Sequence, residues 1–463
     1  MKTPNPFQKL EWIQHEANSP PPLTIRLHIG ASNPTVWVSQ RMPQAGAEER
    51  RICIDKSPRL DASPQGTPTN WPTFAAHHTD FIIHIYILMS VTIREVTTKS
   101  ELRRFVKFPI DLYKGNPYYV PGLIDEEMIT LSRDKNPAFE NCEAIYYLAY
   151  RGERIVGRIA GIIAHAANRV WKQHHARFGF VDFIDDQEVV DALFAAVEKW
   201  ARKKGMDALH GPMGFTDLDH EGMLIMGFDQ IGTMATIYNH PYYPQHMERM
   251  GYTKDQDWHE FKIYIPDAIP EKHLRIAEIV KKKYGLKVLK FRRRKDIMPY
   301  AHKVFETLNA AYTPLYGFAP LTERQIDYYV DIYIPLLRLD LVTVIVREED
   351  DAVVGFGVSL PNLSHALQQA RGSLLPFGFF PLMKALKSKA RVIDLYLTGV
   401  LPEYQNKGVN ALLFTDLIPQ YIKMGAEYAE SNIELENNTA VQAQWDYFKR
   451  EHHKSRRAFI KHL

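Results

Sequence analysis

The residues best suited to chemistry in this sequence form a short turn between an apolar strand and a helix. Residues 392–400 are β-branched and apolar, as is typical of a strand, and Pro402 must end it. The apolar residues after Gly408 have helical spacing. A helix that begins directly after such a turn has unpaired backbone N–H groups, and these favour a phosphate. Gly408 lacks a Cβ, so a ligand can approach its backbone. The alternative is a strand, turn and helix that bind no ligand.

This turn has the sequence VLPEYQNKGVNALL from Val400 to Leu413. It resembles the pyrophosphate-binding motif of the GNAT superfamily, the GCN5-related N-acyltransferases, which is V-x-P-x-x-[Q/R]-x-x-G-x-[G/A] followed by an apolar helix. Asn410 departs from the motif, because the family has Gly or Ala at that place. The resemblance implies that acyl-CoA or acetyl-CoA binds here as a co-substrate, without a metal. The cofactor-binding residues that it implies are Val400, Gln405, Asn406, Lys407, Gly408, Val409, Asn410 and, further on, Asn438.

A wider resemblance covers nearly all of residues 89–463. It is to a bacterial family of tandem GNAT-like N-acyltransferases, some members of which resemble bacterial ceramide synthases. The matching segments are Lys114–Pro121, Arg133–Phe139, Gly211–Met213, Glu221–Gly222, Gly227–Phe228, Pro241–Tyr243 and Leu435–Asn438. The resemblance implies acyl transfer from CoA to an amine, and it leaves the acceptor open.

Acyl transfer to an amine needs a neutral amine, a polarised thioester carbonyl and a proton for the leaving thiolate. Asp394 stands eleven residues before Gln405, where several GNAT enzymes have a general-base Glu. A partner for a basic side chain on a neighbouring strand is the alternative role for Asp394. The resemblance also implies that the backbone N–H of Val400 holds the thioester oxygen.

The general acid is the part of the site on which this sequence departs most from the family. The family's acid is a Tyr seven residues after an Asn of the last helix. Counted from Asn438, that place holds Trp445, and Tyr447 is the nearest substitute. The departure leaves open a non-catalytic protein that binds or senses acyl-CoA.

A second group of candidate residues lies in the irregular stretch 214–240, which is long for a loop of a compact domain. It contains Asp217, Asp219, His220, Glu221 and His240. We predict Glu221 and His240 as catalytic residues that bind the amine or transfer its proton. A metal site and a purely structural role are the alternatives, and nothing else in the sequence completes a metal site.

The segment 362–390 is an insertion with ten nearly uninterrupted apolar residues, 374–383. This apolar run is expected either to pack in a core between two halves of the chain or to form a tunnel or membrane-facing lip for a long acyl chain. The basic runs 281–283 and 292–295 suit anionic headgroups or the 3′-phosphate of CoA, and solvated faces are the alternative.

The order of predicted elements repeats in the two halves, which indicates a duplicated domain. The repeats align at Ile155–Gly157 with Val353–Gly355, and each half has a Gly-ended helix. We therefore predict an α/β fold with a mixed sheet, made of two tandem GNAT folds at 89–270 and 271–463. A last helix is predicted over 439–449. Acidic residues in 183–188, where the second half has its turn, would repel a pyrophosphate, so the first copy is predicted to be degenerate.

Residues 1–88 hold eleven of the twenty-nine prolines and show no lasting period, which predicts a disordered extension. The alternative is that Met89 is the true start and the preceding residues are translated upstream sequence.

The composition excludes several classes of protein. The net charge of +3 requires no nucleic-acid partner, and two distant cysteines fit a reducing cytoplasm. No apolar run approaches the length of about 20 residues that a membrane span needs.

Taken with the resemblance, these observations lead us to expect a cytoplasmic acyl-CoA-dependent N-acyltransferase, with peripheral contact at the inner membrane surface as a further option. The expected acceptor is a lipid-like amine such as a sphingoid base, bound between the two copies. An aminoacyl or peptidyl transferase of the tandem GNAT type is the rival enzyme.

Overall fold

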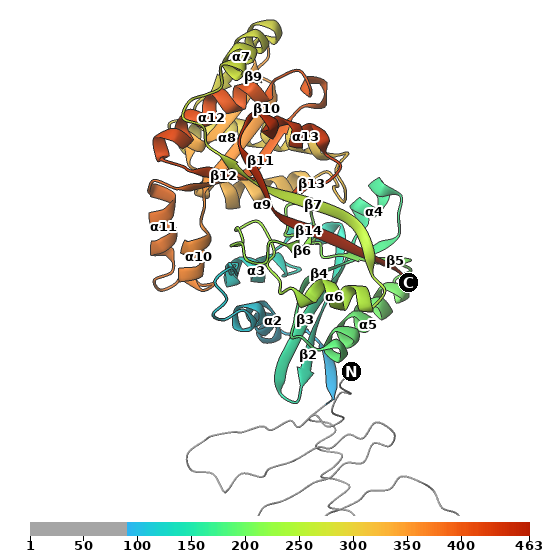
Figure 1. The fold of residues 1–463 in the computed structure, drawn as a ribbon. Helices are drawn as coiled ribbons and strands as arrows, with labels where there is room; N and C mark the ends of the chain where they lie inside the picture. Colours follow the sequence, from blue (N-terminus) through green and yellow to red (C-terminus); the bar gives the residue numbers. More distant parts are fainter. Residues whose placement is uncertain (1–89) are drawn as a thin grey trace, which may run out of the picture. The chain divides into compact units, whose positions relative to one another are not determined.

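The computed structural model describes residues 90–463 (Figure 1). The expectations for residues 1–88 and for a start at Met89 concern residues outside this range. The described part has one continuous mixed sheet with helices on its faces, which confirms the predicted α/β class.

The main path of the sheet has the order β1-β2-β3-β4-β5-β14-β7-β12-β11-β10-β9-β8. The strands are β1 (Val91–Glu95), β2 (Cys142–Arg151), β3 (Arg154–Ala164), β4 (His175–Phe183), β5 (Ala208–Gly211), β7 (Thr253–Tyr264), β8 (Leu286–Leu289), β9 (Val342–Arg347), β10 (Val353–Pro361), β11 (Val392–Val400), β12 (Tyr428–Glu430) and β14 (Arg450–His462). Two short strands leave this path: β6 (Met223–Met226) pairs with β14, and β13 (Glu434–Leu435) pairs with β7.

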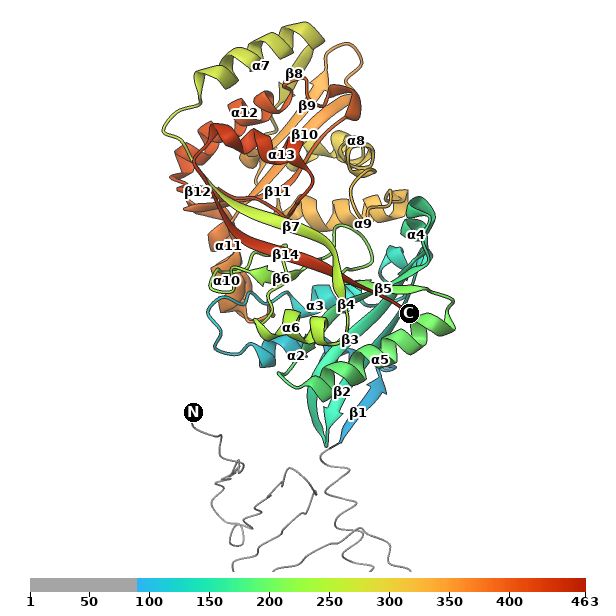
Figure 2. The ribbon, with the colours of Figure 1, turned by 45° about the vertical axis from the view of Figure 1, so that its right-hand side comes forward.

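The order of strands is symmetric about its centre. Five strands of each half lie on either side of the antiparallel pair β7 and β14. The pairs β4–β5 and β11–β12 are parallel, and the other neighbours on each side are antiparallel. Strand β7 is the last strand of the first half and pairs with β12, whereas β14 is the last strand of the second half and pairs with β5. Each half thus supplies the strand that continues the sheet of the other, and Figure 2 shows both strands crossing the middle of the molecule.

Twelve helices cover the sheet in the described part of the chain. They are α2 (Lys99–Leu112), α3 (Ile124–Thr130), α4 (His165–Trp171), α5 (Gln187–Lys203), α6 (Tyr242–Arg249), α7 (Glu271–Tyr284), α8 (Arg294–Tyr312), α9 (Glu323–Tyr333), α10 (Ser364–Ala370), α11 (Phe379–Lys387), α12 (Asn410–Met424) and α13 (Thr439–Ala443). None of the helices within 90–463 is long and apolar enough to cross a membrane.

The predicted last helix over 439–449 is wrong in its length. The helix α13 ends at Ala443, a 3₁₀ turn covers Gln444–Tyr447, and β14 begins at Arg450. The side chain of Trp445 is buried against Phe261 and Ile263 of β7. Packing between distant parts of the chain therefore ends the helix, and this signal is absent from local periodicity.

Candidate functional site

The turn before α12 lies at the N-terminal end of that helix, as predicted. Strand β11 ends at Val400, as predicted, and a 3₁₀ turn at Pro402–Tyr404 leads toward α12. Asn406 and Gly408 have φ of 57° and 81°, and the side-chain amide of Gln405 donates to the Val400 carbonyl at 3.1 Å. Within the described residues, no hydrogen bond is recorded from the backbone N–H groups of residues 406–410. Backbone N–H groups at the N-terminal end of a helix attract anions.

Gly408 also has a packing role at this turn. A Cβ at this position would lie 2.8 Å from Ile276 Cγ2 and 3.3 Å from Val280 Cγ2, both on α7. The glycine is therefore required by helix packing and by its positive φ, whether or not a ligand binds. Lys407 is exposed beside the turn, and its Nζ lies 5.7 Å from the centre of the Tyr284 ring, at the end of α7.

The sheet opens next to this turn. Strands β11 and β12 pair only from Val392↔Tyr428 to Asp394↔Glu430, after which β13 pairs with β7 instead. The Leu401 N–H donates to the Val354 carbonyl of β10 at 2.9 Å. Because N–H directions alternate along a strand, the Val400 N–H points away from β10, toward the opening. The predicted role of Val400 in holding the thioester oxygen stays a prediction.

A cavity of about 400 Å³ extends from this opening to the boundary between the two halves of the chain. Its polar lining includes the carboxyl-bearing residues Asp217, Asp219 and Glu221 of the loop 214–240, together with Glu434 and Asn438. Its apolar lining includes Leu363, Leu367, Leu382, Leu386, Leu413 and Leu417. The cavity thus combines carboxyl groups with an apolar region.

Two carboxyl groups of the loop 214–240 have strongly raised pKa values. Burial raises the pKa of Asp217 to about 7 and the pKa of Glu221 well above its ordinary range. The side chain of Asp219 instead stabilises the loop, since its Oδ2 accepts from the N–H groups of Phe215 and Thr216 at 2.8 and 3.0 Å. No group of three or more metal-binding side chains is found in residues 90–463.

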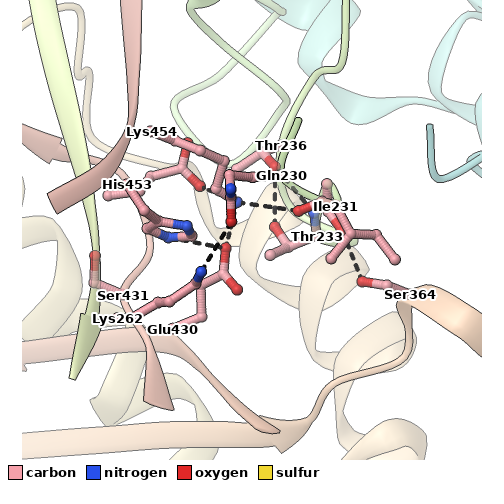
Figure 3. Close-up of polar contacts among 12 residues, drawn as sticks. Gln230, Ile231, Thr233, Thr236, Lys262, Ser364, Glu430, Ser431, His453 and Lys454 are labelled. Atoms are coloured by element: carbon pink, nitrogen blue, oxygen red, sulfur yellow. Dashed lines mark hydrogen bonds and ion pairs between the residues drawn. The ribbon is translucent and has the colours of Figure 1, made fainter. Parts of the chain in front are cut away.

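Asp394 lies beside the cavity but does not line it. Its Oδ1 accepts from the Asn362 side chain at 2.9 Å, and burial, followed by the neighbouring Glu430, raises its pKa to about 7. Glu430 belongs to a buried ionic cluster at the centre of the sheet (Figure 3). There Lys454 pairs with Glu430 and, at 2.9 Å, with Glu260. Asp394 is thus a buried acid at the edge of an ion-pair network.

Glu434 is a functional candidate that the sequence analysis missed. It is 8% exposed, its Oε1 accepts from the Trp445 indole N–H at 2.7 Å, and burial raises its pKa to about 7. Its Oε2 is buried without a hydrogen bond of good geometry in the described part, although the Ser431 hydroxyl lies beside it. The clue in the sequence is Trp445, because a buried indole N–H needs an acceptor nearby.

The structure places the other predicted residues as follows. Asn438 lines the cavity and caps α13, where its side chain accepts from the Val441 N–H at 3.3 Å. Tyr447 is 51% exposed, outside the cavity lining, and accepts from Lys272 Nζ at 2.8 Å. His240 is also outside the lining. It packs in an aromatic cluster of the first half, with its ring centre 4.9 Å from that of Tyr113.

The corresponding turn of the first half, before α5, is filled by side chains of the chain itself. Asp186 caps α5 by accepting from the Glu188 N–H at 3.1 Å. His246 of α6 reaches this turn, where its ring nitrogens lie 2.7 Å from Gln187 Oε1 and 2.8 Å from Asp185 Oδ1.

Comparison with solved structures identifies GNAT proteins as structural neighbours of this fold. A tandem GNAT protein from the clavulanic acid biosynthesis pathway aligns with 81% of this chain and 98% of its own, at 12% identity and a TM-score of 0.47. A GCN5-related N-acetyltransferase from Sphaerobacter thermophilus aligns with 80% of this chain and 95% of its own, at 11% identity and a TM-score of 0.41. No protein-family model matches the chain.

Two curated proteins are similar in sequence. The bacterial ceramide synthase of Caulobacter vibrioides (strain NA1000 / CB15N) is 31% identical over 315 residues, which cover 67% of this chain and 80% of that protein. Protein YghO of Escherichia coli (strain K12) is 29% identical over 377 residues, which cover 80% of this chain and 95% of that protein. The chain belongs to the family of the bacterial ceramide synthase, and the resemblance noted in the sequence is confirmed. The predicted enzyme class, an acyltransferase, is supported by this membership.

Proposed function

We propose that the chain is an acyl-CoA-dependent N-acyltransferase that transfers a long-chain acyl group to a lipid-like amine such as a sphingoid base. The observation that carries this proposal is the opening between β11 and β12. It has the turn at the N-terminal end of α12 at one side and a cavity with carboxyl groups and an apolar region at the other. The relative named as a ceramide synthase supports the choice of acceptor, since a ceramide is an N-acylated sphingoid base.

The proposed donor fits the parts of the opening in order. The N–H groups of residues 406–410 and the Lys407 side chain would hold the pyrophosphate of acyl-CoA. The Val400 N–H would donate a hydrogen bond to the thioester carbonyl oxygen, and the leucine-lined region would take the acyl chain.

The reaction needs one base and one acid, and carboxyl groups at this site are suited to both roles. The amine nitrogen attacks the thioester carbon, and Asp217 in the cavity lining, with a pKa of about 7, takes the amine proton. Glu221 also lines the cavity, but burial keeps it protonated, so it would bind the amine or donate a proton rather than act as the base. The C–S bond then breaks, and Glu434 gives its proton to the leaving thiolate. Asp394 remains a predicted base, but its place outside the cavity lining favours Asp217.

We infer that the halves 89–270 and 271–463 are duplicated GNAT-like folds and that the first has lost its CoA site. Support comes from the symmetric strand order and from the two parallel pairs at matching places. In the first half, Asp186 and His246 fill the turn that would otherwise receive the pyrophosphate.

A non-catalytic acyl-CoA sensor is the second candidate, and Trp445 at the place of the family's acid favours it. Release of free thiol from a long-chain acyl-CoA, measured with and without a panel of amines, separates the two functions. We expect release that depends on a long-chain amine. Tight acyl-CoA binding without amine-dependent release would show a sensor, and turnover of acetyl-CoA with small soluble amines alone would contradict the lipid acceptor.

The contribution of the turn to binding can be tested with Lys407→Glu. A negative side chain beside the pyrophosphate is expected to weaken acyl-CoA binding by about tenfold or more, because it replaces attraction with repulsion. The matched control is Lys423→Glu, an exposed residue at the opposite end of α12. If isothermal titration gives both variants the same affinity for acyl-CoA, the turn does not take part in binding.

A further inference from the structure

The tip of the α10–α11 hairpin, residues 374–383, is an apolar surface that faces water. Leu375, Phe377 and Phe380 are 76%, 73% and 58% exposed. Leu374, Phe379 and Met383 are also exposed, so that six of the fourteen exposed large apolar side chains in residues 90–463 fall within this one segment. Such a concentration of apolar surface marks a contact with a partner or a membrane.

The charges around this tip have one sign. The segment 362–391 contains Arg371, Lys384, Lys387, Lys389 and Arg391, and it has no Asp or Glu. All five basic side chains are exposed. Arg391 pairs with Glu427, whereas no ion pair is recorded for the three lysines among the described residues. Exposed aromatic residues surrounded by unpaired lysines fit a surface of anionic lipid.

The base of the hairpin is fixed to the body of the protein. The Gln368 side chain donates to the carbonyls of Pro117 and Tyr119 at 2.8 and 3.0 Å, and the Ile124 N–H donates to the Gly372 carbonyl at 2.8 Å. The Ser364 hydroxyl donates to the carbonyl of Gly232, which belongs to the loop 214–240, at 2.7 Å. Figure 3 shows the Ser364 side chain directed at that loop. The tip is therefore held at a defined place.

The inner side of the same hairpin lines the cavity. Leu363 and Leu367 of the α10 region and Leu382 and Leu386 of α11 all belong to its apolar lining. One hairpin thus connects the exposed apolar tip with the apolar part of the cavity.

We propose that residues 374–383 insert into the headgroup boundary of a membrane that contains anionic lipid. Lys384 and Lys387 of α11, and Lys389 just after it, would then contact the lipid phosphates. Insertion needs only the exposed tip and its charges. The further step, passage of a long-chain substrate between membrane and cavity along the inner side of the hairpin, rests on the function proposed above.

The test is sedimentation of the full-length protein with vesicles of phosphatidylcholine, with or without phosphatidylglycerol. We expect binding to the mixed vesicles and about tenfold weaker binding of the variant Leu375→Ser/Phe377→Ser/Phe380→Ser. The matched control is Leu274→Ser/Ile279→Ser/Met298→Ser, which removes three exposed apolar side chains elsewhere. Lys384→Glu/Lys387→Glu/Lys389→Glu is expected to lose the preference for phosphatidylglycerol.

Circular dichroism melting of each variant checks that the fold is retained. Full binding by the tip variant, or no binding of the natural protein to either vesicle, would overturn the proposal. Self-association through the tip without vesicle binding would overturn it as well. Because vesicle binding does not require acyl transfer, its failure can be told apart from failure of the proposed enzyme activity.

Discussion

At the scale of single residues, Glu434 carries the most specific chemical expectation. Glu434→Gln keeps the shape of the side chain and an oxygen for the Trp445 indole N–H, but it removes the transferable proton. Loss of a general acid lowers kcat by about 10²-fold to 10³-fold. A thioester with an acidic aryl thiol as leaving group needs no proton donor and should therefore be affected much less. Equal losses of kcat with both thioesters would exclude Glu434 as the acid.

Asp394 gives an expectation for the dependence of stability on pH. Burial raises its pKa from 3.8 to about 7, so the folded chain keeps a proton that the unfolded chain loses. The stability of the natural protein should therefore fall, relative to Asp394→Asn, as the pH rises from about 4 to about 7. Melting temperatures of both proteins at pH 5 and pH 8 measure this difference. If the melting temperature of the natural protein does not fall relative to that of Asp394→Asn between pH 5 and pH 8, then Asp394 is already ionised in the folded chain.

At the scale of elements, the contact between α7 and the turn at Gly408 explains how this glycine can be needed for stability without touching a ligand. Gly408→Ala adds a Cβ 2.8 Å from Ile276 Cγ2 at a φ of 81°, and we expect a loss of stability of about 2–4 kcal/mol. Gly425→Ala is the matched control, because its φ is 75° and nothing lies within 4 Å. Its expected cost is about 1 kcal/mol.

Urea denaturation of the two glycine variants compares these costs. Equal losses of stability would mean that α7 moves away from the turn without cost. In that case Gly408 would be needed only for its backbone conformation or for a ligand.

The elements also show which parts of the fold local sequence can predict. Strand β11 has clear periodicity, and the structure confirms it at the predicted residues 392–400. The helix predicted over 439–449 failed because the burial of Trp445 against β7 depends on residues far away in the sequence. Glu434 escaped notice for the same reason, since only the fold brings it to the indole of Trp445 and into the cavity lining.

At the scale of the whole molecule, the central pair of strands is the feature that no local pattern reveals. Arg450 of β14 pairs with Ile263 of β7, and the same two strands reach β5 and β12 on either side. The loop 214–240 of the first half and the residues after β12 therefore face one cavity. Duplication was predicted from matching signatures, whereas this exchange of strands between the halves was not.

The most direct test of the account is a crystal structure of the protein with a non-hydrolysable long-chain acyl-CoA analogue. We predict that the diphosphate oxygens lie within hydrogen-bond distance of the backbone N–H groups of residues 406–410. The sulfur of the analogue should lie between β11 and β12, with the acyl chain along the leucine-lined part of the cavity. A diphosphate bound elsewhere, with the turn closed by side chains of the protein, would contradict the account.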